Sequence, residues 1–225
     1  MPLNSHDLEH LDYEAGILEE RDPAAALTMW RRGREKAEEE VRRDPSAHSF
    51  HNLGYLCYQI WARTGEGHEE AKKNLLAALR LDSAACLPRF YLGCLYFESG
   101  RLPEARVFLE TTYHTCQSAY AERGQAWRHT KTLEMLAAAS IKLREAAAVI
   151  VKLVAELDRS YASAEDPGSM IPLTIVSTLE ASLANAEPEL PGEVYVSAAN
   201  IVRVTGSIPA IAKRFPRVAT RLRIR

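Results

Sequence analysis

Two histidines one helical turn apart are the first residues whose spacing suggests chemistry. His48 and His51 stand three positions apart, so on a helix their imidazole rings would lie on one face and could share a metal ion. No carboxylate or cysteine stands at a supporting helical spacing, and the HExxH pattern is absent. The sequence therefore predicts no metal site.

The sequence lacks the common catalytic motifs. It contains no GxxxxGK[ST] phosphate loop, no GxSxG, and no Cys/His pair within a characteristic local motif. Paired carboxylates such as Glu69-Glu70 are followed by a basic residue within one turn or face solvent, which is typical of a solvated helix surface. We therefore expect no catalytic residues, no cofactor and a protein that is not an enzyme.

The C-terminal segment concentrates positive charge. The formal net charge is −2, yet residues 194–225 contain seven Lys and Arg and no acid, so this tail carries +7 and the remainder −9. A helical tail would be amphipathic, with Ile211, Phe215, Val218 and Leu222 on one side. The residues predicted to make basic contacts are Lys213, Arg214, Arg217, Arg221, Arg223 and Arg225.

Three roles are open for this tail. It could end in a helix that packs on the acidic body, contact a partner protein or nucleic acid, or anchor the chain to a membrane surface. Pro216 would interrupt a continuous helix, which weakens the anchor hypothesis most.

Helical periodicity runs through nearly the whole chain, and it predicts an all-α fold. The weakest point is the alternation at Val194-Tyr195-Val196, which could also suit a strand. Asp-Pro pairs such as Asp22-Pro23 and Asp44-Pro45 predict helix starts, because Asp can cap a helix whose first residue is Pro.

The start of the sequence and its cysteines bear on location. Residues 1–10 show neither a basic leader nor a signal-length apolar run, and no segment approaches the ~18 apolar residues of a membrane span. We expect a cytoplasmic protein without a membrane span. The four cysteines form no Cys-x-x-Cys pair, and we expect all four to be reduced and buried.

One spacing of small and large apolar residues recurs along the chain. Leu92, Gly93 and Tyr96 are spaced as in W-x2-L-G-x2-Y, with Arg89 at the first position, and the pair Ala105-x3-Leu109 follows. The same two halves occur upstream, in Phe50-x2-Leu53-Gly54-x2-Cys57 and Ala71-x3-Leu75. Weaker copies occur at Leu133-x2-Leu136-Ala137 with Ala147-x3-Val151, and at Ala15-x2-Leu18 with Ala26-x3-Trp30.

This pattern resembles the tetratricopeptide repeat (TPR). The resemblance implies a right-handed superhelical array of antiparallel helix pairs, a TPR-like α-solenoid, over residues 1–160, with the best repeats at 47–82 and 86–118. Small residues suit positions where two helices approach closely, and the interleaved leucines fill the space beside them. Residues 161–225 are expected to form C-terminal capping helices with the basic tail.

In the repeats that this chain resembles, the first helix of each pair lines a concave wall that binds ligands. The resemblance places twelve residues on that wall, and the eight predicted to bind are His48, His51, Tyr55, Tyr58, Phe90, Tyr91, Phe97 and Lys131. The other four are Gln59, Glu98, Glu134 and Lys142. Exposed rings suit capture of a peptide or helix, unless neighbouring or C-terminal helices cover them. Only Lys131 fits the carboxylate clamp of chaperone-binding arrays, which disfavours that subclass.

The leading hypothesis is a non-catalytic scaffold or adaptor that binds a peptide or helix of another protein. One alternative is a nucleic-acid-associated regulator whose basic tail contacts phosphates. Another is a structural subunit of a homo-oligomer.

Overall fold

The computed structural model describes residues 5–185 and 189–224, and over these ranges it is all-helical. Thirteen α-helices and one short 3-10 turn occur in the described ranges, which contain no strand. The all-α prediction is therefore confirmed. The chain forms two compact units, Met1–Leu95 and Tyr96–Arg225, and each is described separately below.

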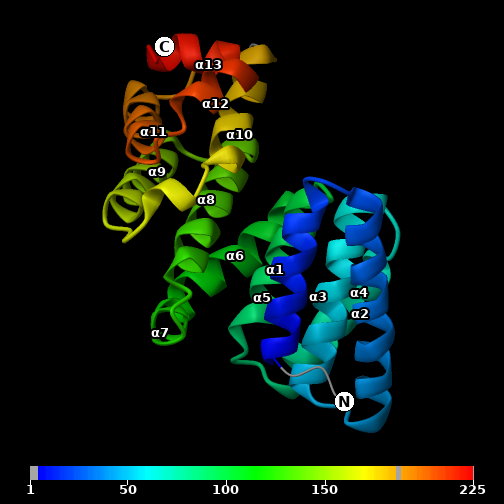
Figure 1. Ribbon diagram of the computed structural model, residues 1–225. Coiled ribbons are helices and arrows are strands. Elements are labelled where there is room, and N and C mark those ends of the chain that lie inside the picture. The colour runs from blue at the N-terminus through cyan, green and yellow to red at the C-terminus, as the bar shows by residue number, and fades with distance from the viewer. Residues whose placement is uncertain (1–4, 186–188, 225) are drawn as a thin grey trace. The chain divides into compact units, whose positions relative to one another are not determined.

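Unit 1 is a series of helices, and Figure 1 shows the first four of them, each packed against the next along the chain. Turns of only a few residues separate consecutive helices, which makes neighbours antiparallel. The helices are α1 (Ser5–Glu19), α2 (Pro23–Arg43), α3 (Ala47–Thr64), α4 (His68–Leu81) and α5 (Cys86–Glu98), whose last residues belong to unit 2.

Local capping sets the starts of α2 and α3. The Asp22 carboxylate accepts a hydrogen bond from the Ala25 backbone N–H at 3.0 Å, as the Asp-Pro pair predicts. At the next Asp-Pro pair the prediction is wrong in detail, because Ser46 rather than Asp44 caps α3. The Ser46 hydroxyl accepts from the Ser49 N–H, and the Ser49 hydroxyl accepts from the Ser46 N–H in return.

The crossing of α3 and α4 depends on the absence of a side chain at Gly54. A Cβ there would lie 2.8 Å from Leu75 Cγ and 2.9 Å from the Leu75 backbone nitrogen. Ala71 and Leu75 on α4 are both fully buried beside this contact. The small residue in the predicted repeat is thus where two helices meet closely.

Unit 2 contains the end of α5 and all later helices. They are α6 (Leu102–Thr115), α7 (Gln117–Glu122), α8 (Ala126–Lys142), α9 (Ala147–Ala162), the 3-10 turn Pro167–Ser169, α10 (Leu173–Ala184), α11 (Gly192–Val204), α12 (Ile208–Arg214) and α13 (Pro216–Leu222). The short helix α7 was not foreseen. The ambiguous segment around Tyr195 lies inside α11, which confirms its prediction as a helix.

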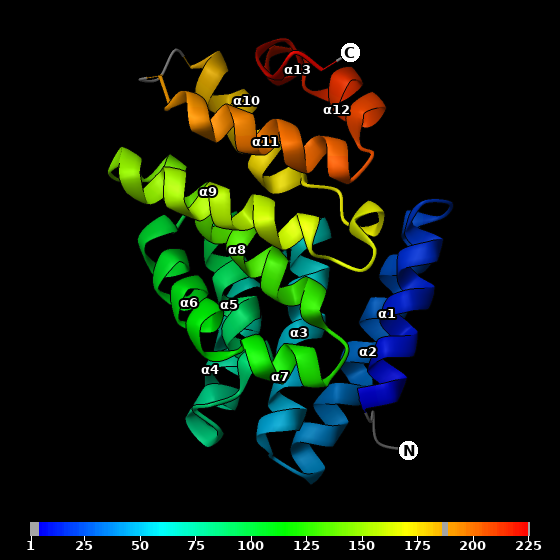
Figure 2. The same cartoon turned by 90° about the vertical axis from the view of Figure 1, so that its left-hand side faces the viewer.

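The C-terminal helices share one hydrophobic core with α8 and α9. Helix α10 packs on α8, and α13 packs on α10. Figures 1 and 2 show α11 running beside α9. Helix α12 ends just before Pro216, where α13 starts, so the predicted break is confirmed. The apolar residues of the tail, Ile211, Phe215, Val218 and Leu222, are all buried in this core.

The superhelical arrangement and the domain boundary near residue 160 remain predictions. Among the described residues, no helix has both the length and the apolar character required to cross a membrane.

The expectation of four reduced cysteines is only partly correct. Cys57 and Cys94 are free and buried. Burial raises the pKa of the Cys57 thiol to about 12, and the nearby Glu70 adds to this effect, so the thiol stays protonated at neutral pH. In unit 1 Cys86 is disulfide-bonded, and in unit 2 Cys116 is disulfide-bonded as well.

Candidate functional site

Most rings predicted to line the wall in unit 1 are buried. His51, Tyr55, Tyr58, Phe90 and Tyr91 are between 3% and 9% exposed. The Tyr91 ring lies 4.7 Å from that of Tyr55 and 5.6 Å from that of Tyr58, measured between ring centroids. Of the two alternatives left open by the sequence, coverage by neighbouring helices therefore applies, because these rings pack between α3 and α5 instead of facing solvent.

Of the predicted binding residues in this unit, only His48 is exposed. Its ring Nε2 lies at hydrogen-bonding distance, 3.1 Å, from Nδ2 of Asn52.

Helix α1 covers one end of this ring cluster. The Tyr55 hydroxyl donates to the Asp12 carboxylate on α1 and accepts from Gln59 Nε2 at 2.5 Å. The Arg63 guanidinium donates one hydrogen bond to Gln59 Oε1 at 2.6 Å and another to Oε2 of Glu19 on α1 at 2.5 Å. Burial raises the Tyr55 pKa well above its usual value, and Tyr91 and Asp12 raise it further. A ligand could reach Tyr55 only if α1 moved.

The predicted wall residues of unit 2 are largely engaged within that unit. Phe97 is 9% exposed, and the Lys142 ammonium lies over its ring, 4.6 Å from the centroid. Lys131 Nζ contacts Glu134 Oε2 at 2.8 Å and Thr174 Oγ1 at 2.9 Å. The Lys131 ammonium thus binds side chains within unit 2 and is not positioned as a free group for a ligand carboxylate.

Glu134, which was expected on the wall, is completely buried. Its Oε1 accepts hydrogen bonds from the backbone N–H groups of Thr174 at 2.8 Å and Ile175 at 3.0 Å, in the first turn of α10. Burial raises the pKa of Tyr161, and the adjacent Glu134 raises it further. Glu134 therefore joins α8 to the positive end of the α10 dipole.

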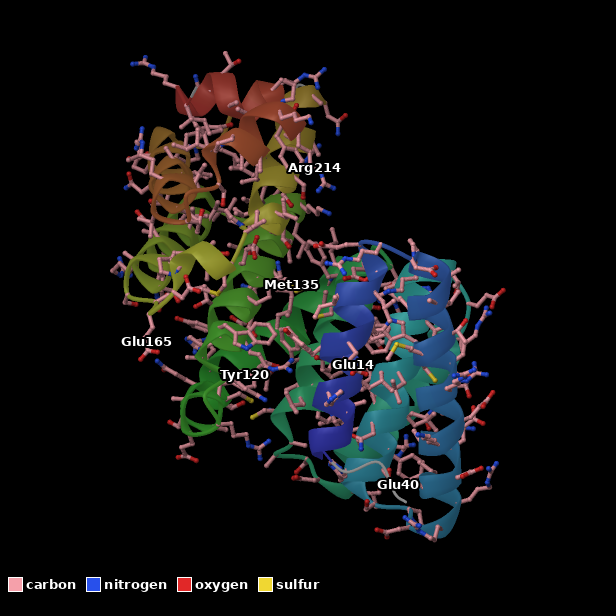
Figure 3. The ribbon with its side chains drawn as sticks, viewed as in Figure 1. Glu14, Glu40, Tyr120, Met135, Glu165 and Arg214 are labelled. Carbon is pink, nitrogen blue, oxygen red and sulfur yellow. The ribbon has the colours of Figure 1, made fainter. Side chains whose placement is uncertain are left out.

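The basic residues of the tail lie on the surface. Lys213, Arg214, Arg217, Arg221 and Arg223 are exposed, and Arg225 lies outside the described residues. Figure 3 labels Arg214, which ends α12. Two of these arginines have acidic partners, because Arg217 lies 3.3 Å from Glu180 and Arg221 contacts Glu189.

A pocket of about 300 Å³ opens between α11 and α13 and is the candidate functional site. We call it the basic pocket. Its lining residues are Gly192, Tyr195, Val196, Ala199, Arg203, Arg221, Leu222 and Arg223. The Arg221 guanidinium lies over the Tyr195 ring at 4.7 Å from the centroid, and Arg203 contacts Asn200 at 3.3 Å. Burial raises the Tyr195 pKa, although Arg221 acts in the opposite direction.

The basic pocket combines two kinds of surface. The guanidinium groups of Arg203 and Arg223 can donate paired hydrogen bonds to carboxylates, whereas Arg221 already contacts Glu189. Val196, which is 62% exposed, offers apolar surface in the same place. This arrangement suits a peptide or helix that presents acidic and apolar side chains together.

The sequence predicted Arg221 and Arg223 as basic contacts of the tail, but it predicted no pocket and did not include Arg203 among those contacts. Arg203 lies on α11, seven residues after Val196, so both occupy one helix face. The helical spacing from Val196 to Arg203 could have indicated a shared face on α11. The sequence could not show that α11 lies beside α13, because only the fold brings these helices together.

Comparisons with known proteins assign no family to this chain: no protein-family model matches it, and no curated protein matches it. Within the described residues, no three or more His, Cys, Asp or Glu side chains are grouped so that they could hold a metal ion.

Proposed function

We propose that this chain is a non-catalytic helical scaffold that binds a helix or peptide of another protein. Its TPR-like spacing supports a repeat scaffold, in which close-packed helix pairs present side chains to partners. The close approach at Gly54 is the packing that such repeats require.

The observation that carries the proposal is the composition of the basic pocket. Arg203, Arg221 and Arg223 surround a hollow whose other lining residues include Val196 and Leu222. The pocket therefore replaces the buried rings as the proposed binding surface, and an acidic amphipathic helix is the partner chemistry that fits it best.

Nucleic acid is the second candidate ligand, because residues 194–225 contain seven basic residues and no acid. Glu180 and Glu189 neutralise part of this charge by pairing with Arg217 and Arg221. The apolar share of the pocket also favours a protein helix over a phosphate backbone. We therefore rank nucleic acid second.

The test is a binding titration of the full chain, followed by fluorescence anisotropy. The probe is a labelled amphipathic helical peptide with glutamates on one face and leucine and tyrosine on the other. The double variant R203E/R223E should weaken binding by about tenfold or more, because it reverses two charges at the pocket. The matched control K213E/R214E makes the same change in net charge on α12, outside the pocket lining, and should change the dissociation constant by less than about twofold.

Equal losses in the two variants would contradict a site at the pocket. If neither affects the peptide but K213E/R214E abolishes binding of a labelled single-stranded RNA, the nucleic-acid function replaces the one proposed here.

A further inference from the structure

We propose that the partner helix is α1 of a second copy of this chain, whose exposed side docks in the basic pocket. This inference rests on the proposed function, since it names the acidic amphipathic helix that the pocket receives. It depends on three features: the exposed face of α1, the way α1 is held, and the charges at the two ends of the sequence.

The exposed face of α1 is a continuous stripe at helical spacing. His10, Tyr13, Glu14 and Ile17 on α1 and Glu20 directly after it are all exposed, and successive members are one or three residues apart. We call these five residues the α1 stripe. Tyr13 is 71% exposed and Ile17 is 45% exposed, so the stripe presents two large apolar side chains to solvent one helical turn apart. Figure 3 labels Glu14 on this helix.

The opposite face of α1 is held within unit 1, so the stripe is not needed to fold that unit. Leu8 and Ala15 are buried. Asp12 and Glu19 accept hydrogen bonds from Tyr55 and Arg63 on α3. A Cβ added at Gly16 would have no described atom within 4 Å, apart from its chain neighbours and the backbone of its own helix, so the side of α1 at Gly16 is open. The stripe is therefore presented on a fixed helix, which lowers the ordering cost of docking.

Charge at the two ends of the sequence is complementary. Residues 1–20 contain six acids and no Lys or Arg, whereas residues 194–225 contain seven basic residues and no acid. Glu14 and Glu20 supply carboxylates to the stripe, and Arg203 and Arg223 supply guanidinium groups to the pocket. Opposite charges of this kind speed encounter and fix orientation.

The apolar surfaces match in the same way. Tyr13 and Ile17 would cover Val196, the exposed apolar side chain of the pocket, in another copy. Because acidic and apolar residues alternate along the stripe, both kinds of contact can form at once.

This contact joins two different surfaces, so it is heterologous. Repeated contacts of this type produce a ring if the rotation between copies closes, and an open chain if it does not. The same property makes a mixing experiment decisive, because each surface can be disabled separately.

Two full-length variants provide the test. The stripe variant Y13S/E14Q/I17S/E20Q removes the apolar and the charged groups of the α1 stripe without adding positive charge, so it cannot pair with an acidic pocket. The pocket variant R203E/R223E disables the pocket. Both replace exposed side chains, and circular dichroism checks that each remains folded. Each variant alone should have the mass of one chain by light scattering, 25.1 kDa. An equimolar mixture should form one complex of about 50 kDa, because the intact stripe of the pocket variant can dock only in the intact pocket of the stripe variant.

Three results would overturn the inference: a mixture that stays at the mass of one chain, a single variant that still self-associates like the wild type, or a wild type that is monomeric throughout. If the wild type still binds the acidic peptide in these cases, the proposed function survives and only the choice of partner fails. If peptide binding is also absent, both fail.

Discussion

At the scale of single residues, Glu134 is a buried carboxylate that holds α8 to α10 within unit 2. Its carboxylate accepts two backbone N–H groups of α10 and pairs with Lys131, in a position with no exposure to solvent. Removing it would leave these donors buried without their partner.

We expect Glu134→Ala to lower the free energy of unfolding by about 3 kcal/mol, because it leaves two backbone N–H groups of α10 without their buried acceptor. Glu134→Gln should lose less, because its amide retains one acceptor oxygen. Urea unfolding of the full chain measures both. The control is Glu104→Ala, whose exposed pairing with Arg101 should matter little. A Glu134→Ala variant as stable as wild type would show that the cap does not hold α10.

Residue roles were the part of the site hardest to predict from sequence. Glu134 and Lys131 share a helix face, but their partner Thr174 lies about 40 residues further along the chain and only the fold brings it near. Tyr55 and Tyr91 were predicted to share one wall, but their burial depends on α1 and on contacts between helices. Helical spacing shows which residues share a face but not what covers it.

At the scale of helices, the sequence predicted the structure better than it predicted the roles of single residues. The helix pair joined through Gly65 and Gly67 was predicted from the repeat spacing, and both glycines adopt the left-handed backbone that such a turn needs. Helix α7 was missed because six residues are too few to show periodicity. The Ser46 cap was missed because the adjacent Asp-Pro pair offered a competing signal.

The close crossing of α3 and α4 gives a prediction at this scale. Gly54→Ala should destabilise the fold by about 2 kcal/mol, because its Cβ would press on the Leu75 backbone, which cannot move aside like a flexible side chain. Gly16→Ala is the matched control, since its Cβ meets nothing and alanine favours helix by roughly 0.5–1 kcal/mol. Thermal unfolding of both variants checks this. Equal effects would mean that the crossing tolerates a methyl group.

At the scale of the whole molecule, the chain presents two surfaces of opposite charge. The α1 stripe is acidic and apolar, and the basic pocket is cationic and apolar. The sequence predicted the basic tail as a contact surface, but the acidic stripe emerged only when the structure showed which face of α1 is exposed. Their complementarity turns a general binding hypothesis into one about copies of the same chain.

The measurement that tests this claim most directly is the mass of the wild-type chain by light scattering as its concentration rises, at low and high salt. Salt at about 0.5 M should weaken the contact, because it screens the charges on the exposed stripe and pocket. We predict a mass that climbs above 25.1 kDa with concentration at low salt and falls back towards 25.1 kDa at high salt. A mass of 25.1 kDa at every concentration and both salts would contradict the account.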